Sequence, residues 1–198
     1  MTLRFPIDGP RKISAHWDEL RPLSAPVEER NHVHGAIDIA APVGTSILAP
    51  EDGSVFYYRA LRPNDREVWD DEVLGPRGLR FPFKNYFYDT FGAIAILEGD
   101  SGLVHLFAHS YFRQHFSRFP AAAWTYQEQI ETSRFVIECM HTFTMPRRVY
   151  AGREIARSGN AGYSSGPHIH WEIHKKPGEL TPFGERPDPE SFIPGASE

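Results

Sequence analysis

The sequence predicts a mainly β protein with an antiparallel sheet at its core and two inserted excursions. Short apolar segments recur along the chain and are separated by turns rich in Gly, Pro and Asp, a pattern typical of a sandwich or barrel. Hydrophobic residues make up 40% of the 198 residues and charged residues 24%, so a packed core can form. Because this length suits one domain with insertions, we expect residues 1–198 to form a single domain.

The first strands are expected after an irregular, proline-containing lead-in that extends to about residue 30. Isoleucines at 37, 39 and 47 predict two short strands around the turn at 42–45. Residues 55–58 continue the sheet after the turn at 51–54, in which Asp-Gly is a hairpin signal.

Two excursions, at about residues 59–91 and 110–148, interrupt this strand pattern. The first is polar and then rich in aromatic residues, which is typical of an inserted surface segment. The second places Ile130 and Ile137, together with Phe135 and Val136, at roughly helical spacing. We therefore expect the second excursion to be partly helical.

Strands resume between and after the excursions. Residues 93–97 and 103–107 flank the sequence Gly-Asp-Ser-Gly at 99–102, which predicts a second hairpin. Apolar residues at 149 and 155, and at 169, 171 and 173, predict further strands. The Pro- and Gly-containing part after residue 175 is expected to lie on the surface.

Charge and composition argue against several classes of protein. Lys+Arg number 21 and Asp+Glu 26, for a net charge of −5, and a protein that binds nucleic acid phosphates usually has a basic excess. The one cysteine, Cys139, is expected to be a buried thiol on a helix and excludes an intrachain disulfide framework. No apolar run approaches the ~20 residues of a membrane span, and no signal peptide is visible. We expect a monomer that binds no nucleic acid.

The strongest local signal is Gly-Pro-His-Ile-His-Trp-Glu at residues 166–172. Side chains alternate between the faces of a strand, so His168, His170 and Glu172 would share one face and the apolar residues the other. Residues on one face lie ~6.6 Å apart along the strand. Both imidazoles can therefore face one site, although only one of them need touch a metal ion.

A second signal is His-Gly-Ala-Ile-Asp at residues 34–38. Zinc binds His nitrogen and Asp oxygen at ~2.0–2.2 Å, whereas His34 and Asp38 would be ~13 Å apart on an extended chain. The chain must bend between them, and Gly35 is best able to allow this.

Two His ligands and one Asp ligand would leave the fourth tetrahedral position for water, as in catalytic zinc sites. The pKa of such a water is lowered toward 7, and its attack on a carbonyl requires a base and a donor to the oxyanion. Whichever of His168 and His170 does not bind the metal ion is a candidate for these roles, and so is His109.

These motifs form part of a longer series of segments, at residues 34–45, 49–55, 107–109, 151–155 and 158–172. The series resembles the lysostaphin/LytM-type zinc endopeptidases (peptidase family M23) over roughly half of the chain. The resemblance implies a compact antiparallel β-sheet fold with a groove over one zinc ion (Zn2+). It also implies a substrate among the peptide cross-links or stem peptides of bacterial peptidoglycan, at the cell envelope or outside the cell.

By this resemblance, His34, Asp38 and His170 would bind the zinc ion. His109 and His168 would be the histidines that activate the water and stabilise the tetrahedral intermediate.

The chain departs from the family pattern at several positions. Most members have Gly two positions before the Asp, where this chain has Ala36 and a glycine one position earlier. Phe107 takes the place of a Tyr, so we expect a phenol near the site to be lost, and an Arg-bearing upstream loop is not recognisable in 13–26. We expect the two long excursions to form walls of the groove and to set specificity.

Two other functions remain possible from the residues. A catalytically weak or inactive LytM-like module could bind the cell wall or regulate other enzymes. A cupin-like metal enzyme could use His32-Val33-His34, which makes His32 a rival ligand. Ordinary surface or core positions are expected for five further histidines: His16, His105, His115, His141 and His174. Among these His105 is the next candidate for a role in the site, because by parity it shares the strand face of His109.

Overall fold

The computed structural model describes residues 1–20, 34–61, 71–74, 80–83, 93–111, 123–131, 136–144, 146–160, 164, 166–175 and 186–194. Within these residues the regular structure consists of β-strands and one short 3-10 helix, η4 (Pro189–Phe192). Every paired strand is antiparallel. The prediction of a mainly antiparallel β protein is confirmed, whereas the single-domain organisation stays a prediction.

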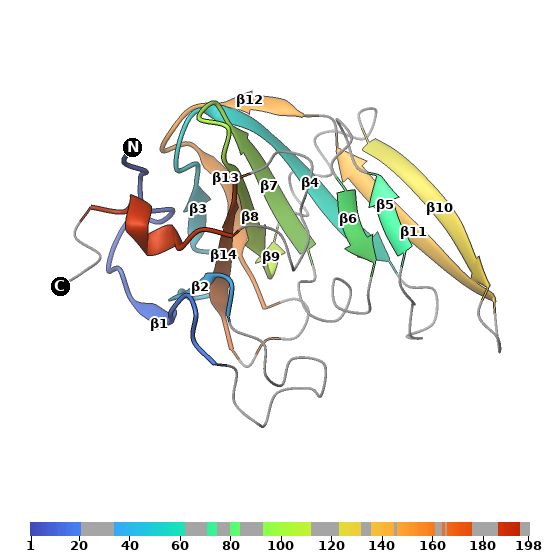
Figure 1. Ribbon diagram of the computed structural model, residues 1–198, viewed down its shortest axis with the longest axis horizontal. Coiled ribbons are helices and arrows are strands. Elements are labelled where there is room, and N and C mark those ends of the chain that lie inside the picture. The colour runs from blue at the N-terminus through green and yellow to red at the C-terminus, as the bar shows by residue number, and fades with distance from the viewer. Residues whose placement is uncertain are drawn as a thin grey trace.

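The strands form one large sheet and two small ones (Figure 1). The nine-stranded sheet has the order β1 (Ile13–Ala15), β2 (Ile37–Ala40), β14 (His168–His174), β8 (Val104–Ala108), β7 (Ala93–Gly99), β4 (Gly53–Leu61), β11 (Val136–Thr144) and β10 (Ala123–Glu131), and β12 (Arg147–Val149) pairs with β4. The second sheet has the order β3 (Ser46–Leu48), β13 (Glu154–Ser158) and β9 (Ser110–Tyr111), and β5 (Asp71–Leu74) pairs with β6 (Arg80–Phe83).

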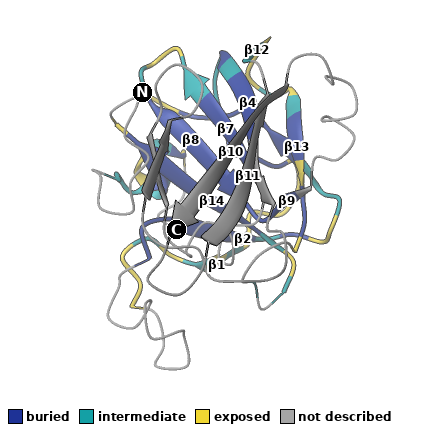
Figure 2. Cartoon of the chain, turned by 90° about the vertical axis from the view of Figure 1, so that its right-hand side faces the viewer, coloured by how far each residue is buried: buried dark blue, intermediate teal, exposed yellow. Residues whose placement is uncertain are grey.

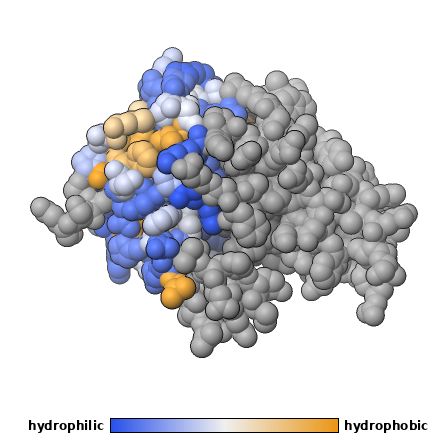
Figure 3. Space-filling view, viewed as in Figure 1, coloured by the Kyte–Doolittle hydropathy of each residue, from blue (hydrophilic) through white to orange (hydrophobic). Residues whose placement is uncertain are grey.

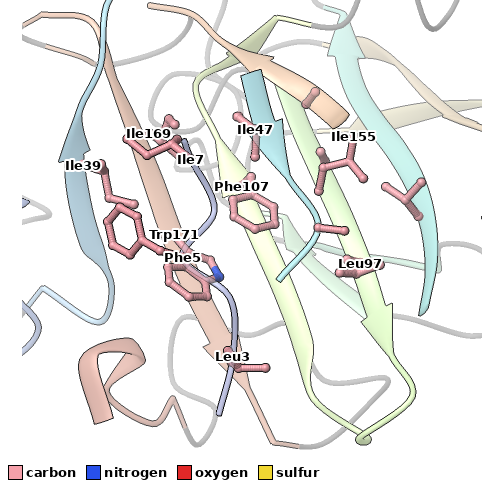
Figure 4. Packing of buried hydrophobic residues seen from close by; sticks show 14 of the residues in the cluster. Leu3, Phe5, Ile7, Ile39, Ile47, Leu97, Phe107, Ile155, Ile169 and Trp171 are labelled. Atoms are coloured by element: carbon pink, nitrogen blue, oxygen red, sulfur yellow. The ribbon is translucent and has the colours of Figure 1, made fainter. Parts of the chain in front are cut away.

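The hydrophobic core lies between one face of the large sheet and the sheet of β3, β13 and β9 (Figure 4). Ile47 and Ile155 of the small sheet belong to one cluster with Phe107 and Trp171 of the large sheet. All four side chains are fully buried, and burial of each stabilises the fold by about 1.5–3 kcal/mol. Because Trp171 must face this core, its neighbours on β14 face the other side of the sheet.

That other side of the large sheet is also buried in its central strands. Glu172, Leu106, Ile96 and Phe56 lie opposite one another on β14, β8, β7 and β4, and each is at most 3% exposed. Figure 2 shows burial along β4, β7 and β8. Burial on both faces accounts for the largely apolar sequences of β7 and β8. The histidines of β14 therefore occupy a largely buried face.

The expected helix in the second excursion is wrong for the residues that the structure describes there. β10 and β11 form a hairpin in which Ile130 lies opposite Ile137, and β11 also pairs with β4. The spacing of a few apolar residues does not separate helix from strand, whereas Trp124, Tyr126 and Ile130 share the even positions of a strand. Sheet pairing then satisfies the backbone groups with which β10, β11 and β4 face one another. Cys139 accordingly lies on a strand.

The two predicted hairpin turns have different outcomes. β7 and β8 form the expected hairpin, with Gly102 at a φ of 87°. The Asp-Gly turn before Gly53 instead connects β3 of the small sheet to β4 of the large one. A Cβ at position 53 would overlap the backbone carbonyl of Glu98, so glycine is required there by the close approach of β7.

No helix in the described part of the chain has the length and apolar character needed to cross a membrane. In the view of Figure 3, the described surface is mostly hydrophilic and its apolar side chains gather mainly in one area.

Candidate metal centre

The register between β2 and β14 brings Asp38 directly opposite His170. Opposite residues of an antiparallel pair have Cβ atoms about 4.5–5.5 Å apart, so the two side chains meet. Asp38 Oδ1 lies 2.9 Å from His170 Nδ1. The same alternation sends Ile37 and Ile39 into the core, where both are fully buried. Core packing of β2 therefore orients the carboxylate toward the histidine.

His34 reaches the same point from the segment before β2. Its backbone N–H donates to Glu19 O, and its carbonyl accepts from the N–H of Asp18, both at 2.8 Å. Its Nε2 then lies 3.2 Å from Asp38 Oδ1 and 3.3 Å from His170 Nδ1. The structure thus brings together the three predicted ligands, and all three side chains are buried.

The outer nitrogens of the two histidines are held by hydrogen-bond acceptors. His34 Nδ1 donates to the carbonyl of His16 at 3.1 Å, and His170 Nε2 donates to Glu172 Oε1 at 3.1 Å. A carbonyl and a carboxylate only accept, so these two nitrogens carry the protons. His34 Nε2 and His170 Nδ1 are left facing Asp38, which is the arrangement of a metal site with its supporting hydrogen bonds.

The carboxylates and imidazoles of the cluster stabilise each other's charged forms. Burial would raise the pKa of Asp38, but the hydrogen bonds and charges of His170 and His34 outweigh it and hold that pKa far below its usual range. Burial would lower the pKa of His170, but the carboxylates of Asp38 and Glu172 raise it to about 9. A divalent cation can replace the proton that is held between these groups.

The three inner atoms fit one zinc ion. Two ligands of a tetrahedral zinc ion at 2.0–2.1 Å lie about 3.3–3.4 Å from each other. The distances between the three inner atoms are 2.9, 3.2 and 3.3 Å, close to one face of such a tetrahedron. Two imidazole nitrogens and one carboxylate oxygen are also the donor set that zinc prefers.

His168 and His109 lie beside this triangle. His168 Nε2 is 3.7 Å from Asp38 Oδ1, and the ring centroids of His168 and His109 are 4.5 Å apart. His168 Nδ1 donates to the carbonyl of Gly166 at 2.8 Å and lies 3.1 Å from Ser164 Oγ. The structure therefore brings both predicted non-ligand histidines to the cluster.

His105 occupies an ordinary core position, as expected, but the parity argument that placed it beside His109 is wrong, because the backbone turns at His109. His109 has a φ of 54° and joins β8 of the large sheet to β9 of the small sheet. His105 instead faces the core, with its ring 5.9 Å from that of Trp171 and its Nε2 2.8 Å from Glu51 Oε1. Burial lowers the pKa of His105 despite this carboxylate.

Two features of the sequence have a different meaning in the structure. Phe107 is fully buried in the core, so a phenol at this position would not lie at the metal cluster. Gly35 does not adopt a positive φ, but a Cβ there would overlap the guanidinium of Arg186. Its lack of a side chain makes room for that arginine beside His34.

The remaining histidines are dispersed. His16 pairs with Glu190, His174 is buried and hydrogen-bonded to Glu172, and His141 lies on β11. The rival ligand His32 and His115 lie outside the described residues. Sequence reasoning missed the partners of the ligands: the same-face position of Glu172 was a usable signal, whereas nothing local indicates Arg186.

The fold and the cluster together define an antiparallel β protein with a His–Asp–His triangle suited to zinc. No protein-family model matches the sequence, and no curated protein matches it.

Several solved structures are similar. The catalytic domain of lysostaphin, an antimicrobial peptidase from Staphylococcus simulans, is 16% identical over 92% of this chain and 91% of that chain, with a TM-score of 0.49. A mutant catalytic domain of the prophage-encoded M23 protein EnpA from Enterococcus faecalis is 19% identical over 94% and 95%, with a TM-score of 0.47. A zinc-containing peptidase from Vibrio cholerae is 19% identical over 87% of this chain but 37% of that one, with a TM-score of 0.46. At these values the similarities carry no conclusion about activity.

Proposed function

We propose that this chain is a zinc-dependent endopeptidase that hydrolyses peptide cross-links or stem peptides of bacterial peptidoglycan. One observation carries the proposal: His109 and His168, which are not part of the ligand triangle, lie directly beside it, and His168 is the least buried of the five side chains. A triangle of three ligands leaves the fourth position of a zinc ion open, but it does not by itself supply proton transfer. Adjacent proton carriers are what hydrolysis requires in addition.

His34, Asp38 and His170 are the proposed zinc ligands. Zinc bound there supplies Lewis-acid polarisation of the scissile carbonyl and lowers the pKa of the attacking water. The hydrogen bonds to His16 O and to Glu172 keep the imidazole rings in the orientation that the metal needs.

His168 is the proposed base. Its Nδ1 is occupied by donation to Gly166 O, so in the neutral ring Nε2 is the nitrogen with a lone pair, and it faces the triangle. It can take the proton of the attacking water and return it to the leaving amine. His109, whose ring is tilted by 58° to that of His168, can donate a hydrogen bond to the developing oxyanion.

The substrate class is supported by the series of motifs that resembles the lysostaphin/LytM-type endopeptidases, in which all five histidine and aspartate positions of the site are present. The inactive-module alternative loses support from this complete set. The cupin-like alternative leaves the pair of histidines on β14 without a role.

The test is hydrolysis of purified peptidoglycan by the zinc-loaded protein, measured as new amino groups and as released peptides identified by mass. We expect release by the wild type and none by Asp38→Ala or His109→Asn, with bound zinc retained only in His109→Asn. Arg148→Gln, at an exposed ion pair with Asp100, is the control and should match the wild type. Zinc-loaded wild type that binds peptidoglycan and releases no amino groups would contradict the proposal and favour a binding module, and metal binding that depends on His32 would favour a cupin-like enzyme.

A further inference from the structure

The C-terminal segment at residues 186–194 returns to the metal centre and is firmly attached to the fold. Ile193 is buried in the core, and Leu3 N–H donates to the carbonyl of Phe192 at 2.9 Å. Asp188 accepts a hydrogen bond from the backbone of Glu190 at the start of η4. In Figure 1 this helix lies beside β14, which it contacts. The segment is therefore a fixed support next to the strand that carries His170.

A buried chain of hydrogen bonds connects this segment to His170. Arg186 donates from its guanidinium to Glu172 Oε1 at 3.3 Å, and the same oxygen accepts from His170 Nε2 at 3.1 Å. The second oxygen of Glu172 accepts from His174 Nε2 at 2.8 Å. Glu172 is 3% exposed, so its carboxylate depends on these partners for its hydrogen bonds. The charge-assisted hydrogen bond from the arginine thus helps to keep the carboxylate aimed at the histidine.

The position of Arg186 is also set from the other side, by Gly35. The guanidinium occupies the space that a side chain at position 35 would need. Gly35 directly follows His34, so the arginine lies between the backbone of one histidine ligand and the supporting carboxylate of the other.

A second, more exposed connection reaches His34. Glu190 Oε1 lies 2.7 Å from His16 Nδ1, and the carbonyl of His16 accepts the hydrogen bond from His34 Nδ1. The side chain of His16 is 62% exposed, so water screens its contact with Glu190. This contact therefore contributes less to the position of His34 than Arg186 contributes to that of His170.

We propose that the C-terminal segment positions both histidine ligands, with Arg186 acting through Glu172 on His170 as its main contact. This inference rests on the proposed metal site. Arg186 and Glu172 are positioning residues: they touch neither the metal nor the substrate, but they set the ring orientation and the protonated nitrogen of a ligand. Loss of such supporting contacts typically lowers metal affinity about 10–100-fold.

The experiment compares zinc affinity, by competition with a chromophoric chelator, and the visible absorption of the Co2+-loaded protein, for full-length variants. Arg186→Gln should lower zinc affinity about 10–100-fold and change the Co2+ spectrum, since the geometry at His170 changes. Gly35→Ala should do the same by displacing the guanidinium while its charge is kept. Both substitutions break the same contact between Arg186 and Glu172. The double variant should therefore bind zinc no more weakly than the single variant with the larger loss of affinity.

Three further variants sharpen the result. Arg186→Lys keeps the charge and one donor and should recover part of the affinity and the Co2+ spectrum, which a general loss of packing would not allow. Glu190→Gln should lower affinity by less than Arg186→Gln, about threefold or less. Arg148→Gln, in an exposed ion pair with Asp100, should change neither readout.

Wild-type affinity and spectrum in both Arg186→Gln and Gly35→Ala would overturn the inference, as would additive effects in the double variant. If Arg186→Gln does not fold, Gly35→Ala and Arg186→Lys decide. Failure of the wild type to bind either metal ion would overturn the metal site and this inference together. Failure to release peptides while these variants still weaken metal binding would overturn only the proposed peptidase.

Discussion

His109 adopts a backbone conformation, φ 54°, that residues with a side chain rarely adopt. For such residues the left-handed region costs about 1–2 kcal/mol, and glycine does not have this cost. Glycine instead loses more conformational entropy on folding, about 0.5–1 kcal/mol relative to alanine. The difference predicts that His109→Gly is more stable than His109→Ala by roughly 0.5–1 kcal/mol, the reverse of the usual order of these residues.

Urea unfolding of the metal-free variants measures this difference directly. In thermal unfolding it corresponds to a shift of about 1–4 °C for a chain of this size. Ala108→Gly is the matched control, because Ala108 lies in the regular strand β8 and glycine should be the less stable residue there. An alanine variant at position 109 as stable as the glycine variant would refute the claim that the backbone is strained at this residue.

Asp38→Ala is expected to weaken zinc binding about 100–1000-fold in a chelator titration, because about 10–16 kcal/mol of binding free energy is shared among four ligand positions. The control Asp100→Ala, at an exposed carboxylate, should leave the zinc affinity unchanged. Acid should destabilise the protein from about pH 6.5 downward, because the lowered pKa of His105 keeps this imidazole neutral in the folded state while the same imidazole takes up a proton in the unfolded chain. The lowered pKa of Glu51 adds to the loss of stability below about pH 4.5. In His105→Phe the urea-measured loss between pH 6.5 and 5 should shrink, and an unchanged profile would contradict the argument. Gly53→Ala should lower the free energy of unfolding by about 1–3 kcal/mol, because its Cβ overlaps the backbone of β7, and a neutral effect would show that the two strands can separate at little cost.

Alternation on β14 is enough to predict which of its residues face the core and which face the site, because a strand with a fully buried tryptophan has only one orientation. The pairing of Asp38 with His170 depends on the register between strands at opposite ends of the chain. That register is set when the apolar faces of β2 and β14 pack into the same core, and the spacing of residues within one segment contains no information on it. The resemblance to a known family supplied the ligand set that spacing left open.

The errors have one physical origin, which is that local patterns ignore the tertiary environment. Ile130 and Ile137 fit a helix as well as a strand until β11 pairs with β4. Parity fails at His109 because the chain changes sheets there. Arg186 reaches the metal centre from a distant segment, and the glycine that makes room for it resembles an ordinary flexible residue in the sequence.

The most direct test of the central claim is a crystal structure of the zinc-soaked protein with anomalous data on both sides of the zinc absorption edge. The account predicts one strong anomalous peak within bonding distance of His34 Nε2, Asp38 Oδ1 and His170 Nδ1, with His109 and His168 beside it and unbonded. A peak bound elsewhere, or one that uses His168 in place of His170, would contradict it.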